Sequence, residues 1–247
     1  DDKLDDTVTI TGGSASTKDS VTVTFATAGT RKPKTVGVEE LIVSATDGAT
    51  TAIAPVLDLS NTTGVTKVTA TAMDTDTLVI DKATNQSVKV VALEAADSVV
   101  EYKLADATGS TDSVTFELSQ AADANSIAND AQLKTTDIET VTVKASTGAE
   151  QISLANLSMT ATGATMSLNI TGDQALTVSA TNADINVIDA SGMDENGSII
   201  QTGRARLDAV TYTGSDGDDT FMMNHKDDAI AAGAGTNDNL VITKQLI

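Results

Sequence analysis

The sequence predicts an all-β protein folded as a parallel β-solenoid with β-roll-like repeats. Three observations predict it. Short segments rich in Thr and Val recur along the chain, the chain aligns on itself at an interval of about one hundred residues, and a Gly- and Asp-rich turn at 214–219 recurs at 232–238. Thr and Val favour strands because branched side chains pack well on a pleated surface. Tandem antiparallel β-sandwiches are the alternative fold.

Composition excludes several classes of function. The chain has 247 residues, with 35 acidic against 15 basic side chains and a formal net charge of -20. Such a balance repels nucleic acid and anionic membrane surfaces and attracts divalent cations, so we expect neither nucleic-acid binding nor membrane insertion. There is no Cys, which excludes disulfides and thiol catalysis. Aromatic residues make up only 2%, which argues against stacking platforms for sugars or bases.

The first predicted unit covers residues 1–106. Its expected strands lie at 19–25, 36–43, 57–60, 77–80 and 88–90, and the segment 68–72 alternates cleanly between apolar and polar residues. Gly, Asn, Asp and Thr separate these segments. Alternation leaves one apolar face on each strand, which stacked coils bury against one another.

The second predicted unit covers residues 107–205 and repeats the first. Segments 112–116, 136–143, 152–158, 175–178 and 185–187 match the five expected strands of the first unit in order. Only residues 120–133, which are rich in Ala, Asn and Asp, are compatible with a helix, and an ordered loop is equally compatible. Repetition at this scale indicates an array of repeats and not a catalytic domain.

The third predicted unit, residues 206–247, carries the candidate site. Gly214, Asp216, Gly217 and Asp219 form a turn that offers backbone carbonyls and carboxylates, which are hard oxygen ligands suited to Ca²⁺. Phe221 follows as the inward apolar residue. The partner turn supplies four further candidate ligands, which are Gly233, Gly235, Asn237 and Asp238. In that turn Asn stands where Asp is expected, and Asp238 follows as if one residue had been inserted.

Other candidate sites are weaker. The turns at 12–21 and 108–114 have the same character, and we interpret them as loops in which Asp side chains bond to backbone amides without a metal. The acidic loop 189–197 lacks the ligand order of a known calcium loop and is interpreted as solvated. No phosphate loop, nucleophile elbow or paired metal-ligand motif occurs in the sequence, so we expect a protein that is not an enzyme.

The nonapeptide-like segment 214–222 resembles that of the RTX family of exported bacterial proteins. The order of segments 37–43, 57–60 and 63–68, followed later by the acidic Gly turn, is similar to the lattice-forming region of RTX-type surface-layer (S-layer) proteins. The resemblance implies an extracellular, Ca²⁺-loaded body that assembles with copies of itself into a two-dimensional coat on the cell. It implies Gly214, Gly217, Asp219 and Gly235 as ligands. Any contact with cell-surface polysaccharide would lie in regions outside this chain.

Two other functions stay open. The chain fits a repeat segment of a giant RTX adhesin, in which Ca²⁺ stiffens a stalk. It also fits, less well, a polysaccharide lyase-like β-solenoid enzyme, which needs a basic residue beside clustered acids and a groove for sugar. Electron microscopy separates a stalk from a lattice, because a stalk gives isolated rods and a lattice protein gives sheets.

Overall fold

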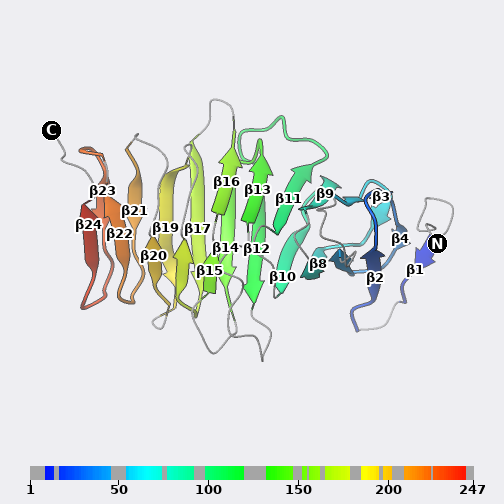
Figure 1. Ribbon diagram of the computed structural model, residues 1–247, viewed down its shortest axis with the longest axis horizontal. Coiled ribbons are helices and arrows are strands. Elements are labelled where there is room, and N and C mark those ends of the chain that lie inside the picture. Colours follow the sequence, from blue (N-terminus) through cyan, green and yellow to red (C-terminus); the bar gives the residue numbers. More distant parts are fainter. Residues whose placement is uncertain are drawn as a thin grey trace.

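The computed structural model describes residues 9–13, 17–45, 54–73, 77–91, 98–119, 132–146, 152–154, 156–161, 165–178, 185–194, 197–201, 209–223 and 225–242. Over these residues the chain is all β, and every pair of neighbouring strands is parallel. The chain returns to each sheet by way of the others, so it winds as a β-solenoid (Figure 1). The predicted fold class is confirmed, and the antiparallel sandwich is wrong.

One long sheet runs the length of the solenoid. Its strands follow one another in chain order, each pairing with the strand one coil earlier and one coil later. The ten strands are β2 (Ser20–Phe25), β5 (Glu40–Ala45), β8 (Lys67–Met73), β10 (Ser87–Val91), β12 (Ser113–Ser119), β14 (Thr140–Ala145), β17 (Met166–Gly172), β19 (Ile185–Met193), β21 (Thr211–Thr213) and β23 (Ala229–Ala231). This sheet passes through all three predicted units.

Three shorter sheets form the other sides. The six-stranded sheet serves the first part of the chain and consists of β3 (Thr30–Arg31), β6 (Val56–Asp58), β9 (Thr77–Ala83), β11 (Val99–Leu104), β13 (Gln132–Thr136) and β16 (Asn156–Thr160). The five-stranded sheet serves the last part and consists of β15 (Ile152–Leu154), β18 (Leu176–Val178), β20 (Ile199–Gln201), β22 (Thr220–Met223) and β24 (Asn239–Ile242). The three-stranded sheet consists of β1 (Thr9–Thr11), β4 (Lys34–Val36) and β7 (Thr62–Thr63).

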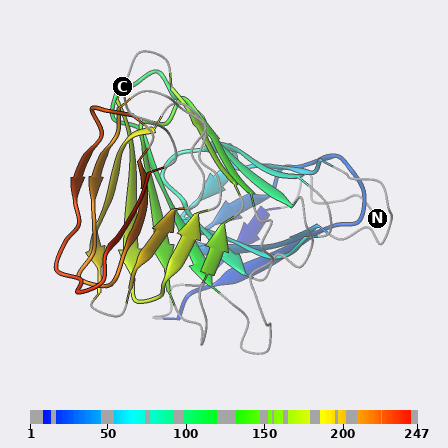
Figure 2. The ribbon, with the colours of Figure 1, turned by 60° about the vertical axis from the view of Figure 1, so that its left-hand side comes forward.

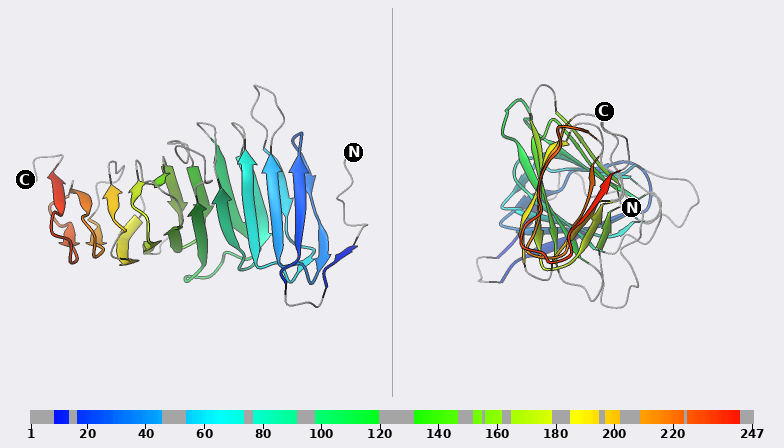
Figure 3. Two further views of the ribbon diagram at one scale, coloured as in Figure 1. Left: turned by 90° about the horizontal axis from the view of Figure 1, so that it is seen from below. Right: turned by 90° about the vertical axis from the view of Figure 1, so that its left-hand side faces the viewer.

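Coil length varies along the solenoid and is shortest at the C-terminal end. Stacked positions are 27 residues apart at Asp112 and Glu139 but only 18 apart at Val210 and Asp228. The left view of Figure 3 shows the body narrowing toward its C-terminal end. The oblique view in Figure 2 and the end-on view in Figure 3 show the sheets enclosing one interior. The shortest coils are those that carry the predicted calcium turns.

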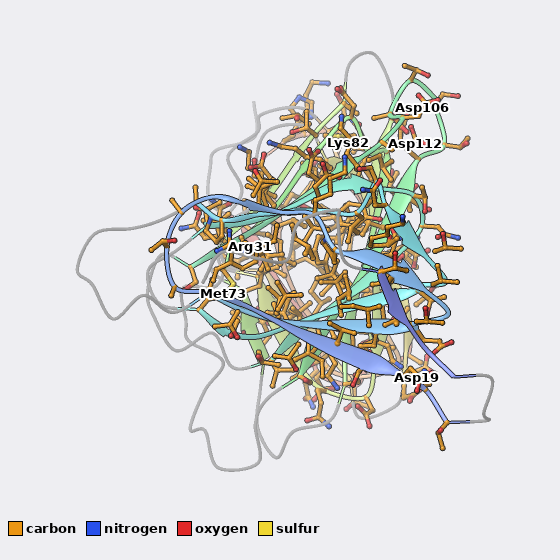
Figure 4. All side chains as sticks on the ribbon, turned by 90° about the vertical axis from the view of Figure 1, so that its right-hand side faces the viewer. Asp19, Arg31, Met73, Lys82, Asp106 and Asp112 are labelled. Carbon is orange, nitrogen blue, oxygen red and sulfur yellow. The ribbon has the colours of Figure 1, made fainter. Side chains whose placement is uncertain are left out.

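A single apolar core fills this interior. Along β5 and β14 every second side chain is buried, as the alternation in the sequence predicts. The largest buried side chains include Tyr102, Tyr212, Phe116 and Phe221, and Phe221 is only 1% exposed, which confirms its predicted inward position. Viewed from the N-terminal end, side chains crowd the centre, while Asp19, Asp106 and Asp112 lie at the rim (Figure 4).

The two matching halves of the sequence share a backbone pattern. The carbonyl of Asp19 accepts the N–H groups of Glu39 and Glu40 at 3.1 Å each, and the carbonyl of Asp112 accepts those of Glu139 and Thr140 at 3.1 and 3.0 Å. In both cases the donors lie one coil further along. The recurrence found in the sequence therefore marks the same corner of the solenoid in two places.

A left-handed backbone conformation recurs at the same corner. Gly37 has a φ of 68° and Asp137, its counterpart in the second unit, has a φ of 54°. Asp is among the few side chains that tolerate this region, since its carboxylate can bond locally. The corner is thus conserved in shape between the units although one of them lacks the glycine.

The segment that was compatible with a helix lies almost wholly outside the described residues. Only Gln132 and Leu133 of that segment are described, and they begin strand β13. Within the described part of the chain, no helix is long and apolar enough to cross a membrane.

Candidate metal site at the stacked glycine turns

The two predicted turns lie one above the other at the C-terminal end of the solenoid. They lead into β22 and β24, where Thr220 pairs with Asn239 (Figure 1). This register places Asp219 beside Asp238, and not beside Asn237. The second turn therefore has one extra residue, as its sequence suggested.

Glycine is required where these turns touch. A Cβ atom on Gly217 would overlap the carbonyl oxygen of Gly197 in the coil before, and one on Gly235 would overlap the carbonyl of Gly217. Gly197, Gly217 and Gly235 thus form a column in which each turn rests directly on the next. Sequence reasoning missed Gly197, because the loop around it has no nonapeptide spacing.

A second contact column lies beside the first. A Cβ atom on Gly214 would overlap the carbonyl of Ala232, and one on Gly233, whose φ is 94°, would overlap the carbonyl of Ser215. Both predicted glycines are therefore needed for close backbone approach. Neither contact by itself shows a bound ion.

Asp219 is buried and satisfied by hydrogen bonds. It is 1% exposed, and its Oδ1 accepts the N–H of Ile199 at 2.8 Å while Oδ2 accepts the N–H of Ser215 at 2.7 Å. The Ser215 hydroxyl lies 2.9 Å from Oδ1 and accepts the N–H of Gly217 at 3.1 Å. Ser215 stands in the second glycine position of the nonapeptide pattern G-G-x-G-x-D-x-U-x. Its hydrogen bonds hold the turn together, a role that the sequence did not predict.

The acids that follow are also engaged with backbone groups. Asp238 accepts the N–H of Asp219 at 3.0 Å. Asp218, an exposed residue absent from the predicted ligands, accepts the N–H groups of Thr236 and Asn237 at 3.0 Å each and the Asn237 side-chain amide at 3.0 Å. The Asn237 amide is the main cause that holds the pKa of Asp218 below its ordinary value of 3.8.

Asp216 is the one predicted acid whose carboxylate accepts no hydrogen bond from any described residue. It stands at the rim of a depression of about 300 Å³ lined by Gly197, Ser198, Asp216, Gly217, Asp218, Ala234, Gly235 and Thr236. The Asp216 carboxylate and the turn carbonyls there provide oxygen ligands of the type that Ca²⁺ takes. The donor type therefore fits Ca²⁺ at the Asp216 side of the turns.

Side chains alone would not complete such a site. Among the described residues, no three His, Cys, Asp or Glu side chains lie close enough together to hold a metal ion. An ion at Asp216 would depend on turn carbonyls for most of its ligands, which Ca²⁺ accepts readily. Asp219 and Asp238 are occupied with N–H donors and do not line the depression.

Acidic side chains cap the corners of other coils in the same way. Glu39 accepts the N–H of Asp19 at 2.8 Å, and Glu139 accepts that of Asp112 at 2.8 Å. Asp228 accepts the N–H of Val210 at 2.8 Å. In each pair the acid belongs to the next coil, so the carboxylate ties two coils together without a metal. We call these contacts acid caps.

The weaker turn at 12–21 behaves as the sequence suggested. Asp19 Oδ2 accepts the N–H of Gly13 at 2.5 Å, so the carboxylate closes its own turn through a backbone amide. The same side chain position in the second unit, Asp112, lies against Gly109. Asp112 Oδ2, however, is buried and has no hydrogen-bond partner among the described residues, so the predicted bonding of Asp to a backbone amide is found at Asp19 and not at Asp112.

Comparisons with known proteins give no relative. No family model, no curated protein and no solved structure matches the chain. The fold and the geometry of the turns are therefore the basis for any functional conclusion.

Proposed function

We propose that this chain is a structural, calcium-dependent surface-layer protein, exported to the bacterial cell surface, where copies assemble into a two-dimensional lattice. In this proposal it has no catalytic role. The observation that carries the proposal is the continuous parallel solenoid whose corners are tied from coil to coil by acid caps and stacked glycine turns. Such a body has long sides against which neighbouring copies can pack.

Charge gives calcium a second role between copies. At a formal net charge of -20, copies of this protein repel one another at low salt. Divalent cations at exposed carboxylates reduce that repulsion, and an ion at a turn also stiffens the coil that holds it. Folding and assembly should therefore both respond to Ca²⁺.

Asp216, with the turn backbones at Gly217 and Gly235, is the proposed place for the ion. Bound there, Ca²⁺ would supply positive charge to a turn whose other acids already accept N–H groups. The chain itself positions the turns through the glycine column, and Ser215 bonds to the carboxylate of Asp219, which does not line the depression.

Chelation tests the proposal. The purified chain is imaged by electron microscopy and followed by circular dichroism in Ca²⁺, in EGTA, and in EGTA with Mg²⁺. We expect sheets and a higher unfolding temperature in Ca²⁺ only. Asp216→Asn, which removes one charge and preserves shape, should weaken the response to Ca²⁺, whereas the matched variant Asp227→Asn should not.

Other outcomes would point to the alternatives. Isolated rods that never form sheets favour the adhesin stalk. Depolymerisation of polyuronate by the purified chain would make it a lyase and overturn the structural role. If spectra, unfolding temperature and assembly are all the same in EGTA, the role of calcium is refuted.

A further inference from the structure

Asp218 is bonded to the next coil by hydrogen bonds at the positions where a metal ion could bind its carboxylate. Both oxygens of this exposed carboxylate are occupied: Oδ1 by the N–H groups of Thr236 and Asn237, and Oδ2 by the Asn237 side-chain amide, all at 3.0 Å. The Thr236 hydroxyl lies 3.5 Å from Oδ1. A carboxylate has about four lone-pair sites, so these donors nearly fill it.

Donors of this kind exclude a cation. Each N–H presents positive charge to the carboxylate from the direction in which a metal would approach. The Asn237 amide also donates to the Thr236 hydroxyl at 3.2 Å, which fixes its NH₂ group toward Asp218. The backbone of the second turn therefore occupies Oδ1 of Asp218, and the Asn237 amide occupies Oδ2.

Residue 237 decides between two ways of closing this link. The strand register sets Asp218 and Asn237 at equivalent positions of successive coils, since Thr220 pairs with Asn239. If residue 237 were Asp, an oxygen would replace the Nδ2 atom at 3.0 Å from Asp218 Oδ2. Two carboxylates at that separation repel each other strongly unless a cation or a proton lies between them.

We propose that the Asn237 amide takes the place of a metal ion at this link, and that residue 237 determines whether the Asp218 side of the turns is closed by hydrogen bonds or by Ca²⁺. Resting on the proposed function, this assignment leaves Asp216 as the acid that holds the ion. Of the predicted ligands, Asn237 is then a replacement for calcium and not a ligand to it.

The test compares the full chain with two variants by calorimetric titration of Ca²⁺ and by thermal unfolding in EGTA and in Ca²⁺. Asn237→Asp should bind one more Ca²⁺ than the natural chain. Its unfolding temperature in EGTA should fall by about 2–4 °C and return in Ca²⁺. Both residues are exposed, so the variant should still fold, which circular dichroism checks.

The double variant Asp218→Asn with Asn237→Asp is the matched control. It exchanges the carboxylate and the amide across the link, so it should restore the stability in EGTA and lose the additional Ca²⁺. If Asn237→Asp gains no Ca²⁺ and responds to EGTA as the natural chain does, the assignment is wrong. If the natural chain takes no Ca²⁺ while Asn237→Asp takes one, the calcium part of the proposed function fails and the assignment of residue 237 stands.

Discussion

Replacing Glu139 tests whether the acid caps hold the coils together. Glu139 is 6% exposed, and its Oε2 accepts the N–H of Asp112 at 2.8 Å from one coil away. In Glu139→Ala the Asp112 N–H loses its acceptor at a corner that water reaches poorly. Hydrogen bonds to charged groups contribute about 1.5–3 kcal/mol, so we expect a loss of that size in the free energy of unfolding.

A shift in unfolding temperature makes this loss measurable. A chain of this length shifts by about 2–4 °C per kcal/mol, which gives a fall of about 3–12 °C for Glu139→Ala by circular dichroism. Glu139→Gln retains an oxygen acceptor and should lose less than half as much. Glu39→Ala, at the matching corner of the first unit, should behave like Glu139→Ala. The two losses should add because the sites lie several coils apart in the long sheet.

The result that would refute this reasoning is specific. If Glu139→Gln lowers the unfolding temperature as much as Glu139→Ala does, the hydrogen bond to Asp112 does not account for the loss of stability. The packing of the Glu139 side chain would then account for it. If neither variant lowers the unfolding temperature by a measurable amount, the acid caps do not stabilise the solenoid.

Two further predictions concern the glycine column and the ion pairs of Glu117. Gly217→Ala should lower the free energy of unfolding by about 1–3 kcal/mol in differential scanning calorimetry, because its Cβ would overlap the Gly197 carbonyl. Gly109→Ala should lower it less, because a Cβ there meets only a carboxylate side chain at 3.1 Å, and equal losses would contradict the stacking of the glycine turns. Partial burial disfavours the charge of Glu117, but Lys67 and Lys89 outweigh it and hold its pKa below 4.5. Because folding lowers that pKa, the natural chain should be more stable than Glu117→Gln above pH 4.5, by less than about 1 kcal/mol. This difference should disappear as the pH falls through the lowered pKa, which urea unfolding at several pH values would show.

The fold was predictable because its signals are local. Alternating Thr and Val residues specify strands with one buried face, and the position of Phe221 after a Gly turn specifies the inward residue. The sequence segments that repeat at Asp19 and Asp112 also lie at the same corner of the solenoid, in two different coils.

The contacts across coils were not predictable from the same signals. Coil length varies, so no constant period tells which residue stands above which, and the partner of Glu39 lies 20 residues away while that of Glu139 lies 27 away. For the same reason Asp238, and not Asn237, is aligned with Asp219. The role of Ser215 was not predictable either, because its hydrogen bonds to Asp219 form only in the folded turn.

The direction of the hydrogen-bond ladders has a mechanical consequence. In every sheet the bonds between strands point from one coil to the next, and the N- and C-terminal coils lie at opposite ends of the body (Figure 3). Tension between the two termini passes through every coil, but at each end it concentrates on the bonds of the terminal coil, so the solenoid should peel one coil at a time from its ends. Each step would release 18 to 33 residues, or about 60–120 Å of extended chain, which gives the protein a way to lengthen under load while its remaining coils stay intact.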